Sequence, residues 1–221
     1  DTAPLQIAIY MQHLGVATLL CKARANPDIH ARTFRIGFSN APPLNLAASR
    51  GHSRLLELLF ACRARMDLHA DVGLTAMRCA AGTGHTAVVR LLLRNSADVD
   101  ERSSDGVTLV HTAALCGHAA TIGVLCSARA DPTRAANDGA SPLHSAAASG
   151  KVAVLQALCS ARADVHVFKR NGATPLHVAA WAGHLSVAQC LIAWGANAEV
   201  MMSSHLTPRG LALERGHMQI A

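Results

Sequence analysis

Aromatic residues and long apolar runs are what this 221-residue sequence most lacks. Only 3% of its residues are aromatic, although 51% are hydrophobic. No apolar run approaches the roughly 20 residues that a membrane-spanning helix needs, so we expect no membrane span. A core with so few aromatic side chains has to be built from small and aliphatic residues, which favours closely packed helices.

Motifs for catalysis and metal binding are also missing. The sequence contains no His-Glu-x-x-His, no Gly-x-Ser-x-Gly and no phosphate-binding loop. Seven cysteines are present, but no two of them form Cys-x-x-Cys, which makes a zinc site improbable. We therefore expect no enzymatic activity, no cofactor, no metal and no small-molecule substrate.

Positive charge is in moderate excess. The formal net charge is +6 with 20 Lys and Arg against 14 Asp and Glu, and the 13 His are counted as neutral. This balance permits an acidic partner without requiring one.

A repeat is the main positive feature. The tetrapeptides at 108–111, 141–144 and 174–177 read Thr-Leu-Val-His, Ser-Pro-Leu-His and Thr-Pro-Leu-His, and they lie 33 residues apart. Gly-His pairs, among them 117–118 and 183–184, keep the same spacing. A fixed period over most of a chain is typical of a solenoid.

Each repeat contains the signals of a helix pair. Thr174 is a good N-cap and Pro175 suits the first helical position, which needs no N–H. Gly183 breaks this helix, and Gly195 suits the left-handed position after a second one. Cys21, Cys126 and Cys159 share one position near the end of the second helix, where we interpret them as small core residues.

These residues resemble the ankyrin repeat. The turns at 105–106, 138–139 and 171–172 match the Asp-Gly opening of that repeat, and 97–99 and 163–165 match its Ala-Asp-Val close. The resemblance implies an all-α solenoid of antiparallel helix pairs with short β-hairpin-like loops. We expect one ankyrin-repeat domain over 1–221, with repeats at approximately 1–28, 29–69, 70–102, 103–135, 136–168, 169–201 and, in part, 202–221.

The resemblance also implies a structural role for the repeated histidines. In ankyrin-like repeats the histidine of Thr-Pro-Leu-His bonds the backbone between repeats, which we expect of His111, His144 and His177. Adjacent repeats lie about 10 Å apart. A zinc ion needs its nitrogen ligands about 2 Å away, so one histidine per repeat cannot converge on a metal.

Two departures from the ankyrin pattern each leave two interpretations open. The second repeat has a longer loop, 29–41, which is either a recognition loop with Phe34, Arg35 and Phe38 as anchors or a segment tucked against the first repeat. The position of Gly195 is taken by arginine in three other repeats, where a left-handed backbone costs about 1 kcal/mol. These arginines are Arg24, Arg129 and Arg162. They either form a basic edge for an anionic partner, or they arose by sequence drift and the helix dipole offsets part of their backbone cost.

In ankyrin-like proteins the partner usually lies on the concave face formed by hairpin tips and first helices. Trp181 with Lys169 and Arg170 is the anchored patch that we predict there, unless Trp181 packs on the next turn. The full set of predicted partner-binding residues is Tyr10, Met11, Phe34, Arg35, Phe38, Arg50, Leu74, Leu115, Lys169, Arg170, Trp181 and Arg215.

The sequence therefore predicts a non-catalytic protein–protein interaction module that acts as a scaffold, an adaptor or a subunit of a larger assembly. One alternative is a targeting or regulatory ankyrin domain of a larger enzyme or channel. Another is a basic-surface binder of nucleic acid or anionic membrane, against which the scarcity of Lys and of clustered charge argues. We expect an intracellular protein, cytoplasmic or nuclear. Because the sequence starts at Asp1 inside a repeat, we also expect it to be part of a longer chain, so an organelle stays possible.

Overall fold

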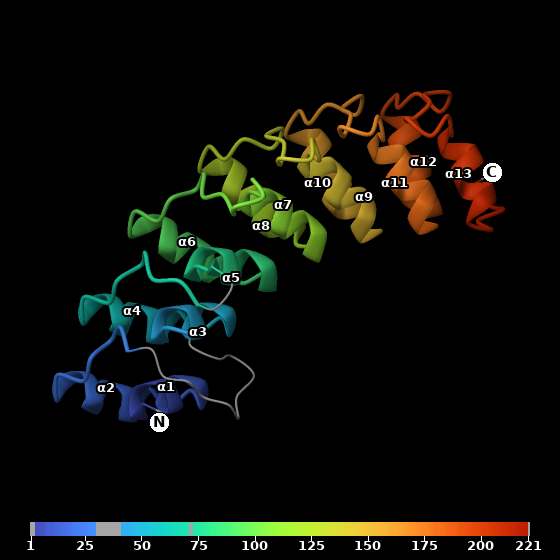
Figure 1. The fold of residues 1–221 in the computed structure, drawn as a ribbon. Coiled ribbons are helices and arrows are strands. Elements are labelled where there is room, and N and C mark those ends of the chain that lie inside the picture. The colour runs from blue at the N-terminus through green and yellow to red at the C-terminus, as the bar shows by residue number, and fades with distance from the viewer. Residues whose placement is uncertain (1–2, 30–40, 71–72, 221) are drawn as a thin grey trace. The chain divides into compact units, whose positions relative to one another are not determined.

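A computed structural model describes residues 3–29, 41–70 and 73–220, which form thirteen α-helices (Figure 1). The first helices of the repeats are α1 (Pro4–Tyr10), α3 (Pro43–Ser49), α5 (Ala76–Thr83), α7 (Leu109–Cys116), α9 (Pro142–Ser149), α11 (Pro175–Ala182) and α13 (Pro208–Glu214). The second helices are α2 (Leu14–Lys22), α4 (Ser53–Ala61), α6 (Thr86–Arg94), α8 (Ala119–Ser127), α10 (Val152–Ser160) and α12 (Leu185–Ala193). The predicted all-α class of repeated helix pairs is confirmed.

The chain divides into two compact units, 1–98 and 99–221. In the first unit α1, α3 and α5 pack in one row, and α2, α4 and α6 pack in another. The second unit has the same two layers, with α7, α9, α11 and α13 in one row and α8, α10 and α12 in the other. The single domain expected over 1–221 stays a prediction.

Small residues at the centre of the first helices let these rows pack closely. The alanine pairs 113–114, 146–147 and 179–180 are completely buried in the second unit. Aliphatic side chains such as Leu125, Leu155 and Leu158 fill the space between the layers. In the part of the chain that the structure describes, no helix has the length and apolar character needed to cross a membrane.

Helix ends in the second unit follow the signals in the sequence. The hydroxyls of Thr108 and Thr174 accept the backbone N–H three residues later, so each caps its helix. Gly150 ends α9 with a left-handed φ of +71°. A side chain there would be strained and would also bring its Cβ within 2.7 Å of the His184 ring, so both backbone and neighbour require glycine.

The repeated histidines link successive repeats of the second unit, as predicted. The Nε2 atom of His111 donates to the Ala140 carbonyl at 2.8 Å, and that of His144 donates to the Ala173 carbonyl at 3.0 Å. The Nδ1 atom of His144 accepts the backbone N–H of Ser141 at 3.1 Å. Each ring is therefore neutral and uses both nitrogens.

Amide side chains make the equivalent links in the first unit. Gln6 Nε2 donates to the Ala41 carbonyl at 2.7 Å, and Asn45 Nδ2 donates to the Leu74 carbonyl at 2.6 Å. The side-chain oxygens of both residues are buried and have no hydrogen-bond partner among the described residues.

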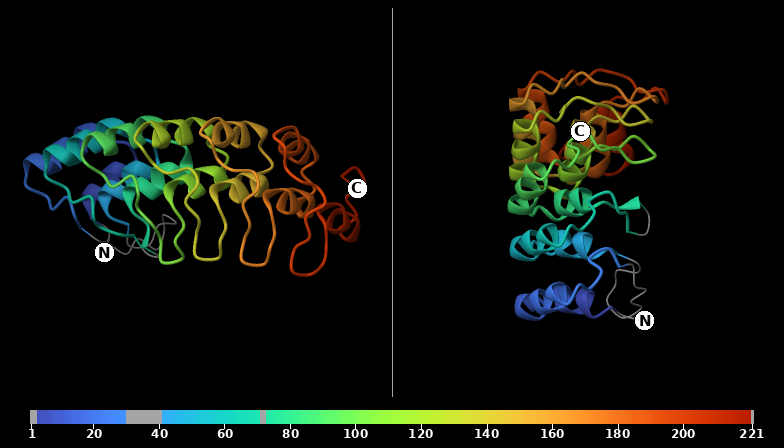
Figure 2. Two further views of the ribbon diagram at one scale, coloured as in Figure 1. Left: turned by 90° about the horizontal axis from the view of Figure 1, so that it is seen from above. Right: turned by 90° about the vertical axis from the view of Figure 1, so that its left-hand side faces the viewer.

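The hairpin tips of the second unit are joined into a row. Within one tip, the Lys169 N–H donates to the Ala173 carbonyl at 2.9 Å. Between tips, the N–H groups of residues 137, 170 and 203 donate to the carbonyls of 105, 138 and 171, each at 2.9 Å. Figure 2 shows these loops next to one another on one side of the helices of this unit. Such cross-linked tips form a rigid edge.

The arginines that replace glycine after the second helices are left-handed, as predicted. The φ angles of Arg24, Arg129 and Arg162 are 60°, 71° and 66°. Arg63 has the same conformation, with φ of 60°, and this identifies its repeat position, which the sequence left open.

Candidate functional site

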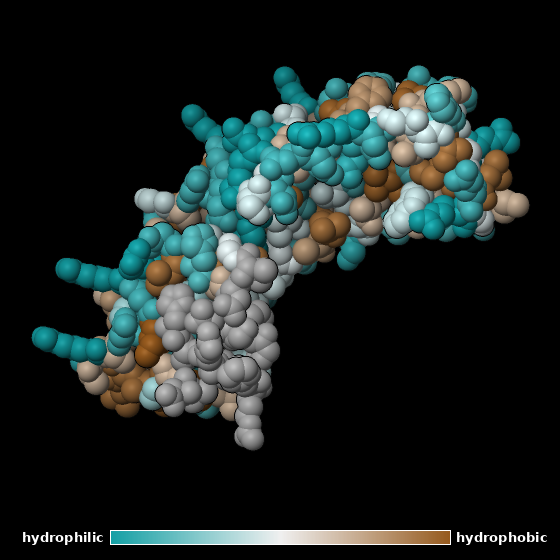
Figure 3. Space-filling model, viewed as in Figure 1, coloured by the Kyte–Doolittle hydropathy of each residue, from teal (hydrophilic) through white to brown (hydrophobic). Residues whose placement is uncertain are grey.

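The face of the second unit formed by its hairpin tips and first helices carries two pockets. One of about 490 Å³ lies between α7 and α9, and one of about 470 Å³ lies between α11 and α13. The face of this unit that Figure 3 shows carries hydrophilic areas and separate apolar patches. We name these cavities the first pocket and the second pocket.

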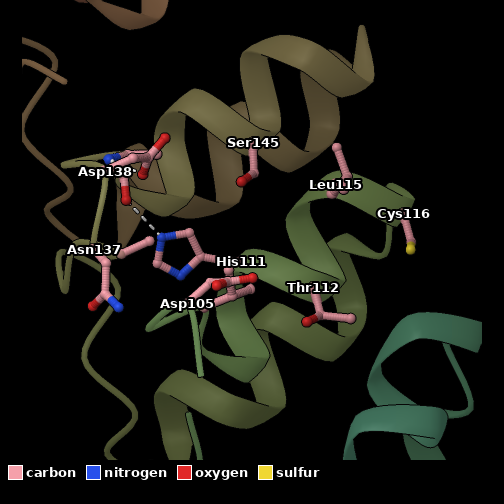
Figure 4. Close-up of a pocket in the computed structure, with 11 residues that line it drawn as sticks. Asp105, His111, Thr112, Leu115, Cys116, Asn137, Asp138 and Ser145 are labelled. Atoms are coloured by element: carbon pink, nitrogen blue, oxygen red, sulfur yellow. Dashed lines mark hydrogen bonds between the residues drawn. The ribbon is translucent and has the colours of Figure 1, made fainter. Parts of the chain in front are cut away.

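The first pocket is bordered by two hairpin tips and two helices (Figure 4). Leu115 and Thr112 come from α7, Ser145 comes from α9, and Asp105 and Asp138 come from the tips. His111 lies at the base, where a dashed line in the figure marks its bond to the Ala140 carbonyl. Leu115 is 58% exposed, so its apolar side chain is available at the rim.

The second pocket is built around an exposed tryptophan. Trp181 of α11 is 52% exposed, and the Arg215 guanidinium lies 4.4 Å from the centre of its ring. This distance is typical of a cation–π contact, which holds the indole in one orientation. The rest of the lining is mainly apolar or amide-bearing and consists of Lys169, Asn171, Ala173, His177, Val178, Met202 and Leu211.

The two pockets are the same site in different repeats. His177, Val178 and Trp181 take the repeat positions that His111, Thr112 and Leu115 take in the first pocket. The intervening repeat places the small residue Ala148 at the position of Leu115 and Trp181. A row of equivalent positions therefore runs from α7 to α11, with an apolar side chain at each end.

Three titratable groups near the pockets, His144, His177 and Asp138, are held in single charge states at neutral pH. Burial lowers the pKa of His144 to about 4, and burial also lowers the pKa of His177. The backbone N–H of Ala140 and the nearby Lys169 lower the pKa of the Asp138 carboxyl. Lys169 lies 3.0 Å from that carboxylate. The site presents fixed charges and neutral imidazoles whose nitrogens are already bonded.

Two of the thiols are held protonated by burial, and the described residues contain no cluster of metal ligands. Burial raises the pKa of Cys21 to about 12, with a further contribution from its hydrogen bond to Cys62. Burial likewise raises the pKa of Cys159 to about 11, so both are protonated at neutral pH. Among the residues with described positions, no group of three or more His, Cys, Asp or Glu could hold a metal ion.

Five of the predicted partner-binding residues lie in the second unit. Leu115 lines the first pocket, Lys169 and Trp181 line the second, and Arg215 covers the Trp181 ring. Arg170 is exposed on the hairpin tip that also carries Lys169. The structure thus brings four of them to the two pockets.

Four others lie in the first unit. The Arg50 guanidinium is 3.8 Å from the centre of the Tyr10 ring, at the same repeat positions as Arg215 and Trp181. Met11 is 56% exposed. Leu74 is half-buried, and its carbonyl accepts the bond from Asn45. The remaining three, Phe34, Arg35 and Phe38, lie outside the described residues.

Sequence reasoning missed several lining residues. Asp105, Asp138, Met202 and Leu211 were not among the predicted partner-binding positions. The repeat register contains a signal for two of them, because Met202 lies one period after Lys169 and Leu211 lies one period after Val178. A pocket between repeats takes part of its lining from the following repeat, so candidate binding positions have to be sought in two successive repeats together.

Comparison with known families agrees with this architecture. The family described as ankyrin repeats, in three copies, matches residues 44–136 and 125–202. No curated protein matches the sequence. Ankyrin repeats are generally protein–protein interaction modules and are typically non-catalytic. Since the match covers more than half of the chain, the protein belongs to the ankyrin-repeat family.

Proposed function

We propose that this chain is a non-catalytic scaffold, adaptor or subunit whose protein partner docks on the second unit, along α7, α9, α11, α13 and their hairpin tips. The observation that carries this proposal is the exposed Trp181, held against Arg215 at the edge of a pocket. Tryptophan and arginine are the residue types most enriched among binding hot spots.

The free-energy cost of exposing an indole supports the same proposal. An indole that is half exposed forgoes much of the free energy that its burial would supply, so an exposed tryptophan beside a pocket is a favourable place for a partner to bury apolar surface. The stack with Arg215 restricts the ring before binding, and the hydrogen-bonded tips restrict the backbone around it. Association then loses little conformational entropy, which favours affinity.

The test is an affinity capture from native extract at two salt concentrations, followed by mass spectrometry. The wild-type chain is compared with Trp181→Ala and with the matched control Trp194→Ala. Trp194 is also partly exposed, at 47%, but it caps the end of α12 and lines neither pocket.

We expect a protein that the wild type and Trp194→Ala retain at both salt concentrations and that Trp181→Ala loses. The same protein should bind the purified chain directly. Capture of nucleic acid or lipid that high salt releases equally from all three chains would contradict the proposal.

A further inference from the structure

The two pockets have similar shapes but different charges. Asp105 and Asp138 line the first pocket, whose lining includes no Lys or Arg. Lys169 lines the second pocket, whose lining includes no Asp or Glu, and Arg215 adds a second cation above Trp181. The row from α7 to α13 therefore has an acidic end and a basic, aromatic end.

Contacts between these charges leave one charged group available at each end. Asp138 and Lys169 form an ion pair with each other, at 3.0 Å. The Asp105 carboxylate is exposed and forms no ion pair within the described residues. Arg215 likewise contacts the Trp181 ring rather than a carboxylate within the described part of the chain. The nearby Arg102 directs its side chain to the carbonyls of Gly106 and Ala135.

Between the pockets, the shared repeat position carries only a short side chain. Ala148 stands at the repeat position that Leu115 holds in the first pocket and Trp181 in the second, and its short side chain is exposed. Adjacent helices pack about 10 Å apart, so positions two repeats apart are about 20 Å apart. An extended chain covers that distance in about six residues at about 3.3 Å each.

We propose that the second unit binds an extended, bipolar peptide segment of its protein partner. A Lys or Arg of the segment lies in the first pocket against Asp105, and its backbone crosses Ala148. About six residues away, a large apolar side chain packs on Trp181, and an adjacent Asp or Glu pairs with Arg215. This inference rests on the proposed function and adds the chemistry of the ligand.

Charge complementarity is the reason to choose a peptide over a nucleic acid. A phosphate backbone carries one sign of charge throughout, so Asp105 and Asp138 would repel it at one end of the row. A bipolar peptide is attracted at both ends and is fixed in one direction, because reversal places like charges together.

The experiment selects random twelve-residue peptides displayed on phage against the whole chain, with a parallel selection against Trp181→Ala. We expect the wild type to enrich a basic residue and an apolar–acidic pair about six residues apart. The Trp181→Ala chain should enrich no such pattern. Sequences without both charges, or no enrichment specific to the wild type, would overturn the inference.

A charge exchange then tests the direction in which the peptide binds along the row. It uses the best selected peptide, synthesised with a fluorophore. Asp105→Lys should weaken binding about tenfold, and exchanging the basic residue of the peptide for Glu should restore binding to that variant alone. Asp105 is exposed, and circular dichroism melts will verify that the variant folds as the wild type does. Asp164→Lys, an exposed acid outside both pockets, is the matched control and should leave binding unchanged.

The outcomes separate this inference from the proposed function. If Trp181→Ala abolishes binding of the captured partner while Asp105→Lys changes no affinity, the docking face stands and the bipolar segment is wrong. If neither variant affects partner binding, both proposals are wrong. Stronger binding of single-stranded nucleic acid than of the selected peptide, in a competition assay, would also contradict the bipolar peptide.

Discussion

In the second unit, three consecutive repeats place histidine at the third position of the first helix, whereas two repeats of the first unit place Gln6 and Asn45 there. All five side chains donate a hydrogen bond to a backbone carbonyl of the next repeat. In these five repeats the position supplies a hydrogen-bond donor, and three different side chain types provide it. The two units differ in what happens at the other end of the side chain.

The N-cap residue explains that difference. In the second unit, Nδ1 of each histidine accepts the N–H of a Thr or Ser N-cap, at 3.1–3.2 Å. The N-caps of the helices that carry Gln6 and Asn45 are Ala3 and Pro42, which have no hydroxyl, and proline has no N–H. Within the described part of the chain the buried oxygens of Gln6 and Asn45 have no partner, and each such group costs about 1–3 kcal/mol. In the second unit both ring nitrogens of these histidines are hydrogen-bonded. Because the buried rings are neutral, the stability of this unit becomes sensitive to acid.

The largest expected effect is this acid sensitivity. The pKa of His144 is about 4 in the fold against 6.5 for an unperturbed histidine, so the unfolded chain binds the proton first as the pH falls. Stability is full above pH 6.5 and decreases down to pH 4, by about 3 kcal/mol for His144 alone. Urea unfolding followed by tryptophan fluorescence measures it, because both tryptophans lie in the second unit.

The replacement of the imidazole by an amide should reproduce the weakness of the first unit. We expect His144→Gln to lose about 1–2 kcal/mol at pH 7, because Gln6 shows that such an amide reaches the next repeat while its oxygen stays unpaired. The same variant should flatten the pH profile between 4 and 6.5. Fluorescence-detected urea unfolding at both pH values tests this, and an unchanged profile would show that other groups cause the acid sensitivity.

The reverse exchange should strengthen the first unit. Asn45→His combined with Pro42→Thr installs the cap and imidazole of the second unit on α3, and we expect a gain of about 1 kcal/mol. The backbone at Pro42 is extended, with φ −56° and ψ 151°, so threonine fits it. Hydrogen exchange of the α3 amides by mass spectrometry reports the change locally. Faster exchange than in the wild type would contradict the role that we assign to the cap.

The smallest effect concerns the left-handed arginines. Arg162→Gly should stabilise the second unit by about 0.5–1 kcal/mol, because φ of 66° favours glycine. Gly195→Ala is the opposite control: a Cβ there meets no atom within 4 Å, so only backbone strain at φ +90° acts, and we expect a similar loss. Thermal unfolding tests both. Weaker partner binding by Arg162→Gly would favour the basic-edge interpretation.

Much of the fold follows from the period of the sequence. The helix starts at Thr108 and Thr174 and the histidine links could be predicted, because each depends on a few neighbouring residues and on the repeat register. The register also placed Leu115 and Trp181 on one face. These features are local, so the sequence is sufficient for them.

Contacts that depend on side-chain conformations across repeats could not be predicted. The stack of Arg215 on Trp181 joins different helices, and the pairing of Asp138 with Lys169 joins two hairpin tips. The division into two units could not be predicted either, since the repeat spacing is 33 residues both just before and just after residue 98.

The most direct test of the account compares two equivalent aromatic positions, Trp181 in the second unit and Tyr10 in the first. Isothermal titration calorimetry with the captured partner would measure the affinities of Trp181→Ala, Tyr10→Ala and the wild type. We predict a loss of more than about tenfold for Trp181→Ala, as for a hot-spot tryptophan, and a smaller loss for Tyr10→Ala, whose ring lies in the first unit and is less exposed. Unchanged affinity of Trp181→Ala, or a larger loss for Tyr10→Ala, would contradict the docking of the partner on the second unit.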